Sequence, residues 1–446
     1  MPTGTRKVAF SFDERQITHF GGMWLIQRFC NRLRLRHWLH RYVRPFQRRT
    51  EYDPAELLPA LMFAIIMGLR RINKTEILQY NGACLEMLGL ERFPDQATLR
   101  RFLKRLPPTA IRQLVRLHDS LRAYLFALPA RRTTLVFDLD SVVVVIYGHQ
   151  AGARIGYNPK KHGRRSYHPL LCFEAHFQEF WHGRLRPGNA ASSTGAVPFL
   201  KVCLAKVPPT IARRRIRFRM DAGCYGNRVI RFLDESQCGS VSVVPEYPHL
   251  RARAQSCRFH RLRNGWEAGV FRAPVHHKWK RRHRFVVIRR PLPTDPTEVE
   301  QLTFFTDTRY GSHLFVTNLT LSPWRGYLFY RPRAAVEKNI RELLSDYPLG
   351  QIPTDSWTAN VAFFHLLLLA ANLVHWFKRL CLPSEYHTAT LDTIRTDFLV
   401  LPARLVREHK KKIVRLPHDY HYQREFLAAM VKIQRLRLPR SFRFCK

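Results

Sequence analysis

Apolar residues recur at helical spacing through residues 1–130. Residues 54–69 are apolar on nearly every side, as expected of a helix that is buried in a bundle. Residues 93–106 place Asp95 in N-capping position, and the residues after it separate into an apolar and a basic face. This basic face is either solvated or lies on DNA phosphates, and the spacing favours neither reading. It is formed by Arg100, Arg101, Lys104 and Arg105.

Beyond residue 130 the period changes to two and β-branched residues form runs, a pattern typical of strands. Residues 133–148 are expected to form one long strand that carries Asp138 and Asp140 on the same face. A second strand over residues 215–221 ends in Asp221, and a turn that contains glycine and then a helical run follow it. Strand, turn and helix in this order indicate an α/β fold.

Residues 240–312 are strand-like again, with turn residues between the strands, and predict an antiparallel β unit inserted into the α/β fold. From Tyr330 onward the pattern is helical and the chain ends in a basic region. The longest apolar stretch, residues 361–374, is shorter than the ~20 residues that a membrane span needs. We therefore expect a buried helix there and no contact with a membrane.

The large positive charge of the chain indicates which class of molecule it binds. Its 446 residues include 75 Lys and Arg against 33 Asp and Glu, a formal net charge of +42. So large a surplus repels itself unless a polyanion neutralises it, and nucleic acid is the expected partner. The nine cysteines form no Cys-x-x-Cys pair, which argues against a zinc finger and fits reduced thiols in the cytoplasm. The sequence has no glycine-rich phosphate loop, so no nucleotide cofactor is expected.

Acidic residues are scarce, and three of them stand on separate predicted elements. Asp140 lies in a Val-rich strand, Asp221 at a strand end and Glu337 in a helix. If they converge, they offer only oxygen ligands, which suit Mg²⁺ or Mn²⁺ and are poor for zinc. Two such ions about 4 Å apart can activate one oxygen and stabilise the leaving one in phosphoryl transfer. The alternative is that each acid forms an ion pair with one of the many arginines, and the spacing leaves both readings open.

The residues that follow Asp140 resemble the first catalytic block of a bacterial insertion-sequence transposase of the DDE type. In that family an Asp-Ser/Thr pair precedes Tyr-Gly-x-Gln and Gly-Tyr-Asn-Pro-Lys-Lys. Here Asp140 and Ser141 precede the same residue types, which start at Tyr147 and at Gly156. The Asp-Ser match favours Asp140 over Asp138 as the first acid of the family.

Three further blocks follow in the order that the family has them. Residues 185–200 are similar to its Arg-x-Gly-Asn segment, and residues 219–225 to its Arg-x-Asp-x-Gly block with the second acid. Tyr330, Arg333 and Glu337 match the Tyr-x-x-Arg-x-x-x-Glu signature with the third acid. Each block alone is weak, but the four in order make a specific signal.

The resemblance implies a catalytic core with an RNase H-like fold, interrupted by the β insertion after the second acid. Asp140, Asp221 and Glu337 would form the catalytic triad and hold two Mg²⁺ ions, with Mn²⁺ as a substitute. The enzyme would bind the terminal inverted repeats of its insertion sequence. Water would cleave the phosphodiester at the transposon end, and the freed 3′-hydroxyl would attack target DNA in a cut-and-paste route. Because two ends need two active sites, we expect a homodimer on double-stranded DNA.

Resemblance and pattern together divide the chain into five parts. As a bacterial enzyme that acts on chromosomal DNA, it is expected in the cytoplasm, on the nucleoid. The expected parts are a helical N-terminal DNA-binding domain (1–130), an α/β RNase H-like core in two pieces (131–239 and 313–381), an antiparallel β insertion (240–312) and a basic helical C-terminal region (382–446).

The same resemblance places two signature residues, Tyr330 and Arg333, at the DNA backbone near the scissile phosphate. Both also have simpler readings, a core aromatic for the tyrosine and an ion pair within the helix for the arginine. The related signature ends with Lys seven positions beyond the Glu, and this position is Leu344 here. That contact is made by Lys338, by Arg341 or by neither.

A second group of expected DNA contacts is basic and surrounds a tryptophan. Trp279 would stack on an unstacked base at the DNA end, or it would pack inward beneath a basic hairpin, and Trp266 is the other candidate for stacking. The basic residues of this group and of the loop after the first strand are Lys160, Lys161, Arg164, Arg165, Lys278, Lys280 and Arg281.

Two other functions are compatible with the sequence. One is a basic DNA- or RNA-binding protein whose catalytic site no longer works, although the presence of all three acids counts against it. The other is a divalent-metal nuclease on the same core that performs no strand transfer. Short inverted repeats beside the gene, with a direct duplication beyond them, would favour mobility over both.

Overall fold

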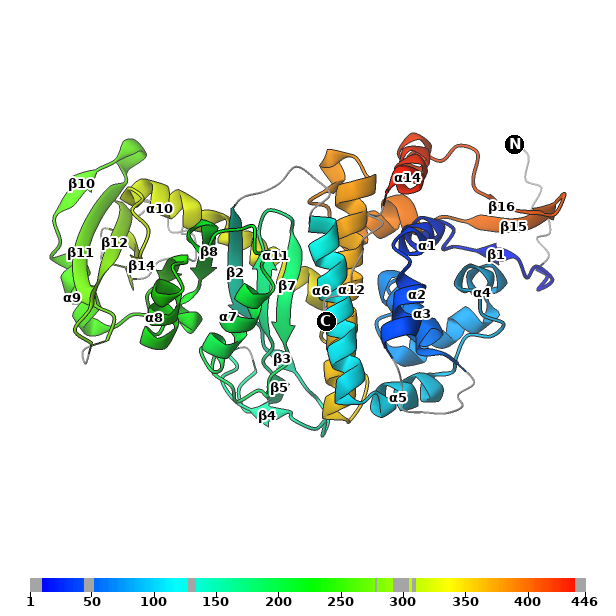
Figure 1. Ribbon diagram of the computed structural model, residues 1–446, viewed down its shortest axis with the longest axis horizontal. Helices are drawn as coiled ribbons and strands as arrows, with labels where there is room; N and C mark the ends of the chain where they lie inside the picture. Colours follow the sequence, from blue (N-terminus) through cyan, green and yellow to red (C-terminus); the bar gives the residue numbers. More distant parts are fainter. Residues whose placement is uncertain are drawn as a thin grey trace, which may run out of the picture.

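Helices α6 (Pro108–Phe126) and α12 (Trp357–Cys381) lie side by side in the middle of the molecule and separate a helical end from a β-sheet end (Figure 1). The molecule is elongated as a result. The computed structural model describes residues 10–43, 52–126, 134–159, 161–276, 279–291, 305–306 and 310–437.

The helical end is formed mainly by the described residues before 127, as the sequence predicts. Local signals start two of its helices. Asp53 and Glu56 form a capping box at the start of α3, and the Asp95 carboxylate accepts a hydrogen bond of 2.8 Å from the Thr98 amide at the start of α5. These helices are α1 (Met23–Arg32), α2 (Leu35–Tyr42), α3 (Pro54–Ile66), the 3₁₀ helix η1 (Ile72–Tyr80), α4 (Gly82–Leu88) and α5 (Gln96–Arg105).

The central part of the sheet holds five strands in the order β7-β6-β2-β8-β9. β2 runs parallel to β8, and β8 runs parallel to β9, whereas β6 is antiparallel to both of its neighbours, β2 and β7. Along β2, Phe137 and Leu139 pack beneath helices α7 and α8, and Asp138 and Asp140 point to the other face. The elements are β2 (Leu135–Ser141), β6 (Leu170–Glu174), β7 (Glu179–Arg184), α7 (Ala196–Ala205), β8 (Ile216–Met220), α8 (Asn227–Glu235) and β9 (Gly239–Val243).

The expected long strand over residues 133–148 is wrong in length, because β2 ends at Ser141. Ser141 pairs with Leu170 of β6, and the next partner, Pro169, has no amide hydrogen to continue the ladder. The chain then leaves the main sheet. Its next strand, β3 (Val144–Val145), joins a separate small sheet with β5 (Arg165–Tyr167) and β4 (Arg154–Ile155).

The strands that follow β9 continue the main sheet rather than forming a separate one. β14 pairs antiparallel with β9, and β12 and β11 follow outward in antiparallel order. A helix, α9 (Pro248–Gln255), packs near β11. The outer strands are β10 (Phe259–Arg261), β11 (Glu267–Pro274), β12 (Arg282–Pro291), β13 (Phe305–Thr306) and β14 (Tyr310–Thr317).

The strand register gives this long sheet one continuous face. Asp138 pairs with Arg219, Arg219 with Val241, and Val241 with Thr317. Paired residues on neighbouring strands point to the same side of a sheet. The outer strands therefore extend the face that carries Asp138, and α10 (Pro323–Tyr330) packs on this extension.

Helix α12 is 25 residues long and apolar enough to cross a membrane by length and composition. However, 78% of its most apolar 18-residue window is buried inside the protein. It packs against α3 and α5 on the helical side and against β7 on the sheet side. The predicted buried helix is thus the contact between the two ends of the molecule, and it follows α11 (Ala334–Ser345) along the chain.

The C-terminal region departs from the prediction, because it is only partly helical. Residues 403–415 form a two-stranded ribbon of β15 (Ala403–Glu408) and β16 (Lys411–Arg415). The short strand β1 (Ile17–Thr18) pairs with β15, so the region packs back on the N-terminal helices. The helical parts are α13 (Leu391–Ile394) and α14 (Gln423–Arg435).

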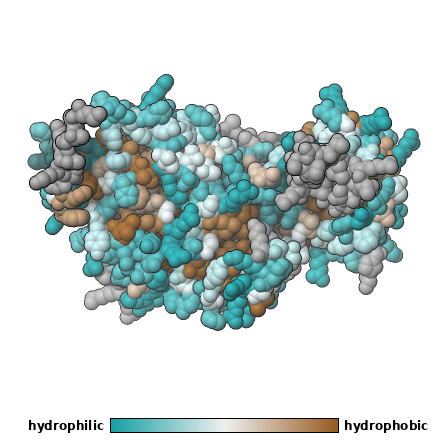
Figure 2. Space-filling view, turned by 180° about the vertical axis from the view of Figure 1, so that it is seen from behind, coloured by the Kyte–Doolittle hydropathy of each residue, from teal (hydrophilic) through white to brown (hydrophobic). Residues whose placement is uncertain are grey.

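Seen from behind, the surface is largely hydrophilic (Figure 2). The apolar side chains that show lie mainly in the middle of the molecule and over its helical end. A hydrophilic surface with a net charge of +42 suits a polyanionic partner.

Candidate active site

Two of the three predicted acids lie at the same edge of the sheet because their strands are parallel neighbours. Asp140 is near the end of β2, and Asp221 directly follows β8, whose Met220 pairs with Leu139. Each carboxylate is oriented by a backbone amide. Asp140 accepts a hydrogen bond of 2.8 Å from Ser141, and Asp221 accepts one of 3.0 Å from Cys224.

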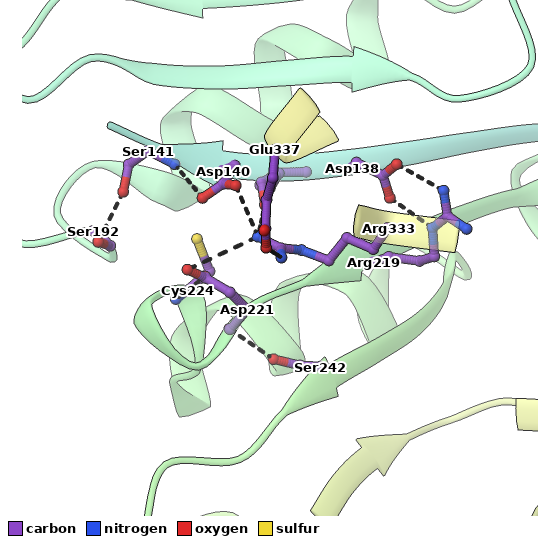
Figure 3. Close-up of polar contacts among 11 residues, drawn as sticks. Asp138, Asp140, Ser141, Ser192, Arg219, Asp221, Cys224, Ser242, Arg333 and Glu337 are labelled. Carbon is purple, nitrogen blue, oxygen red and sulfur yellow. Dashed lines mark hydrogen bonds and ion pairs between the residues drawn. The ribbon is translucent and has the colours of Figure 1, made fainter. Parts of the chain in front are cut away.

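The third acid, Glu337, comes from the first turn of α11 and faces the same point (Figure 3). The guanidinium of Arg333 lies between the three carboxylates. Its nitrogens are 3.1 Å from Asp140, 3.9 Å from Asp221 and 3.3 Å from Glu337. It also donates to the Leu139 carbonyl at 3.4 Å. The structure thus brings together the three acids and the arginine that the sequence predicts.

Burial sets the electrostatics of this cluster. It raises the pKa of Asp140 to about 6, against the opposing effect of Arg333. Burial alone would lower the pKa of Arg333, but the nearby carboxylates outweigh it and raise that pKa. The exposed fraction of the acidic side chains increases from 12% for Asp140 to 34% for Asp221 and 54% for Glu337. The site is therefore open on the side of Glu337.

Asp138 belongs to a separate ion pair. Arg219 donates two hydrogen bonds of 2.6 Å to its carboxylate, and both side chains are buried. The same guanidinium donates to the Phe329 carbonyl at 2.9 Å. The carboxylate of Asp138, two residues before Asp140, is therefore bound by Arg219. The Asp138–Arg219 pair connects β2 and β8 to the end of α10.

The donor set has the chemistry of a site for a hard divalent cation. It offers only carboxylate oxygens, and a cationic group already lies among them. In the part of the chain that the structure describes, no three acidic, histidine or cysteine side chains are close enough together to share one ion. Because the guanidinium of Arg333 lies between the carboxylates, it would have to move from its present place when ions bind.

The remaining signature residues lie around this cluster. Tyr330 is half-buried and packs against Phe315 with ring centroids 4.9 Å apart, which fits the reading of a core aromatic beside the site. Lys338 is exposed and donates to the Thr388 carbonyl at 3.2 Å. Arg341 is exposed on the helix face of Glu337, one turn further along.

The predicted basic loop lies in the small sheet that follows β2. Lys161, Arg164 and Arg165 are exposed there, and Lys160 is outside the described residues. The ammonium of Lys161 donates to the Tyr147 hydroxyl and lies over its ring, 4.9 Å from the centroid. On the basic face of α5, Arg101, Lys104 and Arg105 are exposed and Arg100 is half-buried, and Lys104 forms an ion pair of 2.5 Å with Asp355.

The two candidate tryptophans lie on opposite faces of the sheet. Trp279 packs with the apolar cluster on the far side from the carboxylates and stacks on His283, with centroids 5.0 Å apart. Trp266 packs on the near side with Tyr327, in the cluster that contains Tyr330. Of the basic residues around Trp279, Lys280 and Arg281 are exposed, and Lys278 is outside the described residues.

Sequence reasoning missed two groups next to the site. Arg219 is the buried partner of Asp138. The sequence contains a signal for this pair, because Asp138 lies two residues before Asp140 and Arg219 lies two residues before Asp221. Ser192 lies 2.9 Å from the Ser141 hydroxyl, which fixes the loop 185–195 beside Asp140. Only the fold brings these serines together, because 51 residues separate them in the chain.

Comparison with known proteins places the chain in a family. The family model described as transposase DDE domain group 1 matches residues 1–438. No curated protein matches the chain. Among solved structures, the cryo-EM structure of the piggyBac transposase synaptic complex with hairpin DNA is similar over 81% of this chain and 78% of that chain, with 10% identity and a TM-score of 0.40. Since the family match covers nearly the whole sequence, the chain belongs to the transposase DDE domain group 1 family.

Proposed function

We propose that this protein is a DNA transposase that binds the terminal inverted repeats of its insertion sequence, cleaves the DNA there and joins the freed ends to a target by a cut-and-paste route. The observation that carries the proposal is the convergence of Asp140, Asp221 and Glu337 on Arg333. These residues lie on three elements that are far apart in the sequence. Simple surface ion pairs would not need the three acids to share one partner.

The sheet supports an RNase H-like core for this activity. In the order β7-β6-β2-β8-β9, only β6 runs antiparallel to the central strand β2, and β7, β8 and β9 run in the same direction as β2. This is the strand order of RNase H-like folds. Asp140 lies on the central strand, Asp221 at the end of its parallel neighbour, and Glu337 on a later helix.

Asp140, Asp221 and Glu337 would hold two divalent ions, Mg²⁺ or Mn²⁺. Bound ions of this kind activate an attacking oxygen and stabilise a leaving oxygen in phosphoryl transfer. The chain itself orients the ligands, because the amides of Ser141 and Cys224 hold the two aspartates. The partial exposure of Glu337 leaves room for the DNA strand on that side.

Arg333 has a role of its own in this proposal. Its guanidinium neutralises the carboxylates in the free protein and would turn to the phosphate next to the scissile bond when DNA and metal bind. Tyr330 lies on the same face and would contact the backbone beside it. Lys338 and Arg341 would continue this contact along α11.

Double-stranded DNA, both transposon ends and target, is the proposed partner. Lys161, Arg164 and Arg165 would contact its phosphates from the small sheet, and Lys280 and Arg281 from the segment just before β12. A homodimer on DNA is proposed because two ends must be cut together.

The test is excision of a marker flanked by the terminal sequences of the gene, with wild type and Asp140→Ala compared. We expect Mg²⁺- or Mn²⁺-dependent excision by the wild type and none by the variant. Binding of these ends without cleavage by the wild type would contradict the proposal and favour an inactive DNA-binding protein. Cleavage without joining would favour a nuclease.

A further inference from the structure

The β15–β16 ribbon projects from the helical end of the molecule, far from the carboxylate cluster (Figure 1). Its register runs from Arg404 paired with Arg415 to Glu408 paired with Lys411. β1 covers one edge of β15, and β16 is the last strand of this sheet in the part of the chain that the structure describes. The ribbon is therefore anchored at its base by strand pairing, and its outer part extends beyond β1.

The tip of the ribbon is a two-residue turn whose conformation does not suit its residues. His409 and Lys410 both have left-handed backbone angles, with φ of 47° and 64°. Turns of this kind favour Asn-Gly, because side chains beyond Cβ make left-handed angles costly. A histidine and a lysine at these positions do not help the turn to form. Their side chains are therefore expected to contribute to binding rather than to the stability of the turn.

The ribbon is strongly basic and its positive charges are exposed. Residues 403–415 include six Lys and Arg and one acid, Glu408, and all six cations are exposed to solvent. Four of the six have acidic partners. Arg404 pairs with Glu14 at 2.9 Å, Arg415 pairs with Glu408, and Arg407 and Lys412, which lie next to the tip, pair with Glu86 of α4.

The two tip lysines differ from these four cations. Among the described residues, neither Lys410 nor Lys411 has an acidic partner. Lys411 shares a face of the ribbon with Ile413 and Arg415, the face opposite to that held by Glu86. Glu86 therefore holds one face on the helical domain. On the other face Arg404 and Arg415 are paired with Glu14 and Glu408, and Lys411 is exposed to solvent.

We propose that this ribbon grips the backbone of duplex DNA at a distance from the catalytic site, an inference that rests on the proposed function. Two features favour this occupant over a protein. Among the described residues the two tip lysines have no acidic partner, and a two-stranded ribbon fits within a DNA groove. The contact is with phosphates and is independent of sequence, since lysines at a hairpin tip act as point charges.

The test is DNA binding by full-length protein with the two tip lysines replaced, Lys410→Gln with Lys411→Gln. Binding is measured without divalent ions, so that cleavage plays no part, on a duplex of the terminal sequence and on a scrambled duplex. Two lost phosphate contacts raise the Kd about 30-fold at 0.15 M salt and lower the slope of log Kd against log salt by about 2. Both duplexes are expected to show the same loss.

The matched control replaces two exposed cations on the face of the main sheet that lies away from the carboxylate cluster. These changes are Lys201→Gln on α7 and Arg228→Gln on α8. This control is expected to bind as the wild type does. Unchanged affinity of the tip variant would overturn the proposal. So would a change in its molecular mass in solution without a change in DNA affinity, which would assign the ribbon to contact between chains. If the tip variant loses affinity and the wild type never cleaves DNA, the ribbon proposal stands and the proposed function fails.

Discussion

Arg219 binds Asp138 through two hydrogen bonds of 2.6 Å inside the sheet, two residues before the acid that faces Arg333. The sequence offers Asp138 and Asp140 as rivals for one role, and this pairing separates them. Asp138 has a permanent cationic partner that is buried with it. Asp140 shares its partner with two other carboxylates at a partly open site.

Removing the charge of Asp138 should destabilise the protein, because it leaves Arg219 buried without a counter-charge. For Asp138→Asn we expect a loss of roughly 3–5 kcal/mol in the free energy of unfolding. The double variant Asp138→Leu with Arg219→Met should recover most of this loss, since neither charge is then buried. Chemical denaturation of the wild type, the single variant and the double variant measures these differences in the free energy of unfolding. Equal destabilisation by the single and double variants would contradict a simple charge pair.

Arg333→Ala should destabilise the metal-free protein and make it more responsive to divalent ions. The variant leaves Asp140, Asp221 and Glu337 without their common cation. We expect a loss of about 2 kcal/mol, less than for a fully buried pair because two of the acids are partly exposed. Mg²⁺ or Mn²⁺ should raise the melting temperature of the variant more than that of the wild type.

The control for this experiment is Arg331→Ala, an exposed arginine in the same turn. It should leave both the stability and the response to metal unchanged. An equal thermal shift by divalent ions in wild type and Arg333→Ala would show that the arginine and the ions do not compete for the same carboxylates.

The two tryptophans should have separable effects, because they lie on opposite faces of the sheet. Trp266→Ala should slow cleavage at the DNA end about tenfold with little change in binding, as expected when one stacked base loses its aromatic partner. Trp279→Ala should mainly lower stability, because it removes the ring that stacks on His283. Single-turnover cleavage and thermal unfolding distinguish the two. A larger cleavage defect for Trp279→Ala would return the stacking role to that residue.

His182 should make the fold sensitive to acid. Burial, and then Lys206, lower its pKa to about 2, and the Lys206 ammonium lies 3.1 Å from Nδ1 of the ring. As the pH falls below the ordinary value of 6.5, the unfolded chain takes up a proton and the folded protein does not. Stability is therefore lost toward low pH, at ~1.4 kcal/mol per pH unit from this group.

His182→Gln should remove this contribution. Urea denaturation between pH 6.5 and 4.5 should give a shallower loss of stability for the variant than for the wild type. His260→Gln, an exposed histidine on β10, is the matched control and should leave the slope unchanged. Parallel slopes for His182→Gln and wild type would contradict a neutral buried ring.

Local signals and residue types predicted much of the fold and the cluster. The capping position of Asp95, the apolar run that became α12 and the strand that ends at Asp221 all depend on neighbours in the sequence. The meeting of Asp140, Asp221 and Glu337 followed from their places on separate elements and from the resemblance to the family. The sequence signals did not place Arg333 between the three acids, and this position is known only from the structure.

Features that depend on strand register were not predictable from the sequence. The end of β2 at Ser141 depends on Pro169 of the neighbouring segment, and the partner of Asp138 depends on the pairing of β2 with β8. The ribbon at residues 403–415 was missed because its charge pattern also fits a basic helix. Its strand structure becomes evident only where β1, from the other end of the chain, pairs with it.

The central claim is that the three converging carboxylates form a metal-dependent DNA-cleaving site, and one measurement tests it most directly. Strand cleavage of a duplex with the terminal sequence is followed in Mg²⁺ or Mn²⁺ for wild type, Asp140→Asn, Asp221→Asn and Glu337→Gln, with DNA affinity measured alongside. We expect each variant to lose cleavage and to keep its affinity for the end, because metal and phosphate contacts are separate. Normal cleavage by any one of the three variants would contradict the assignment.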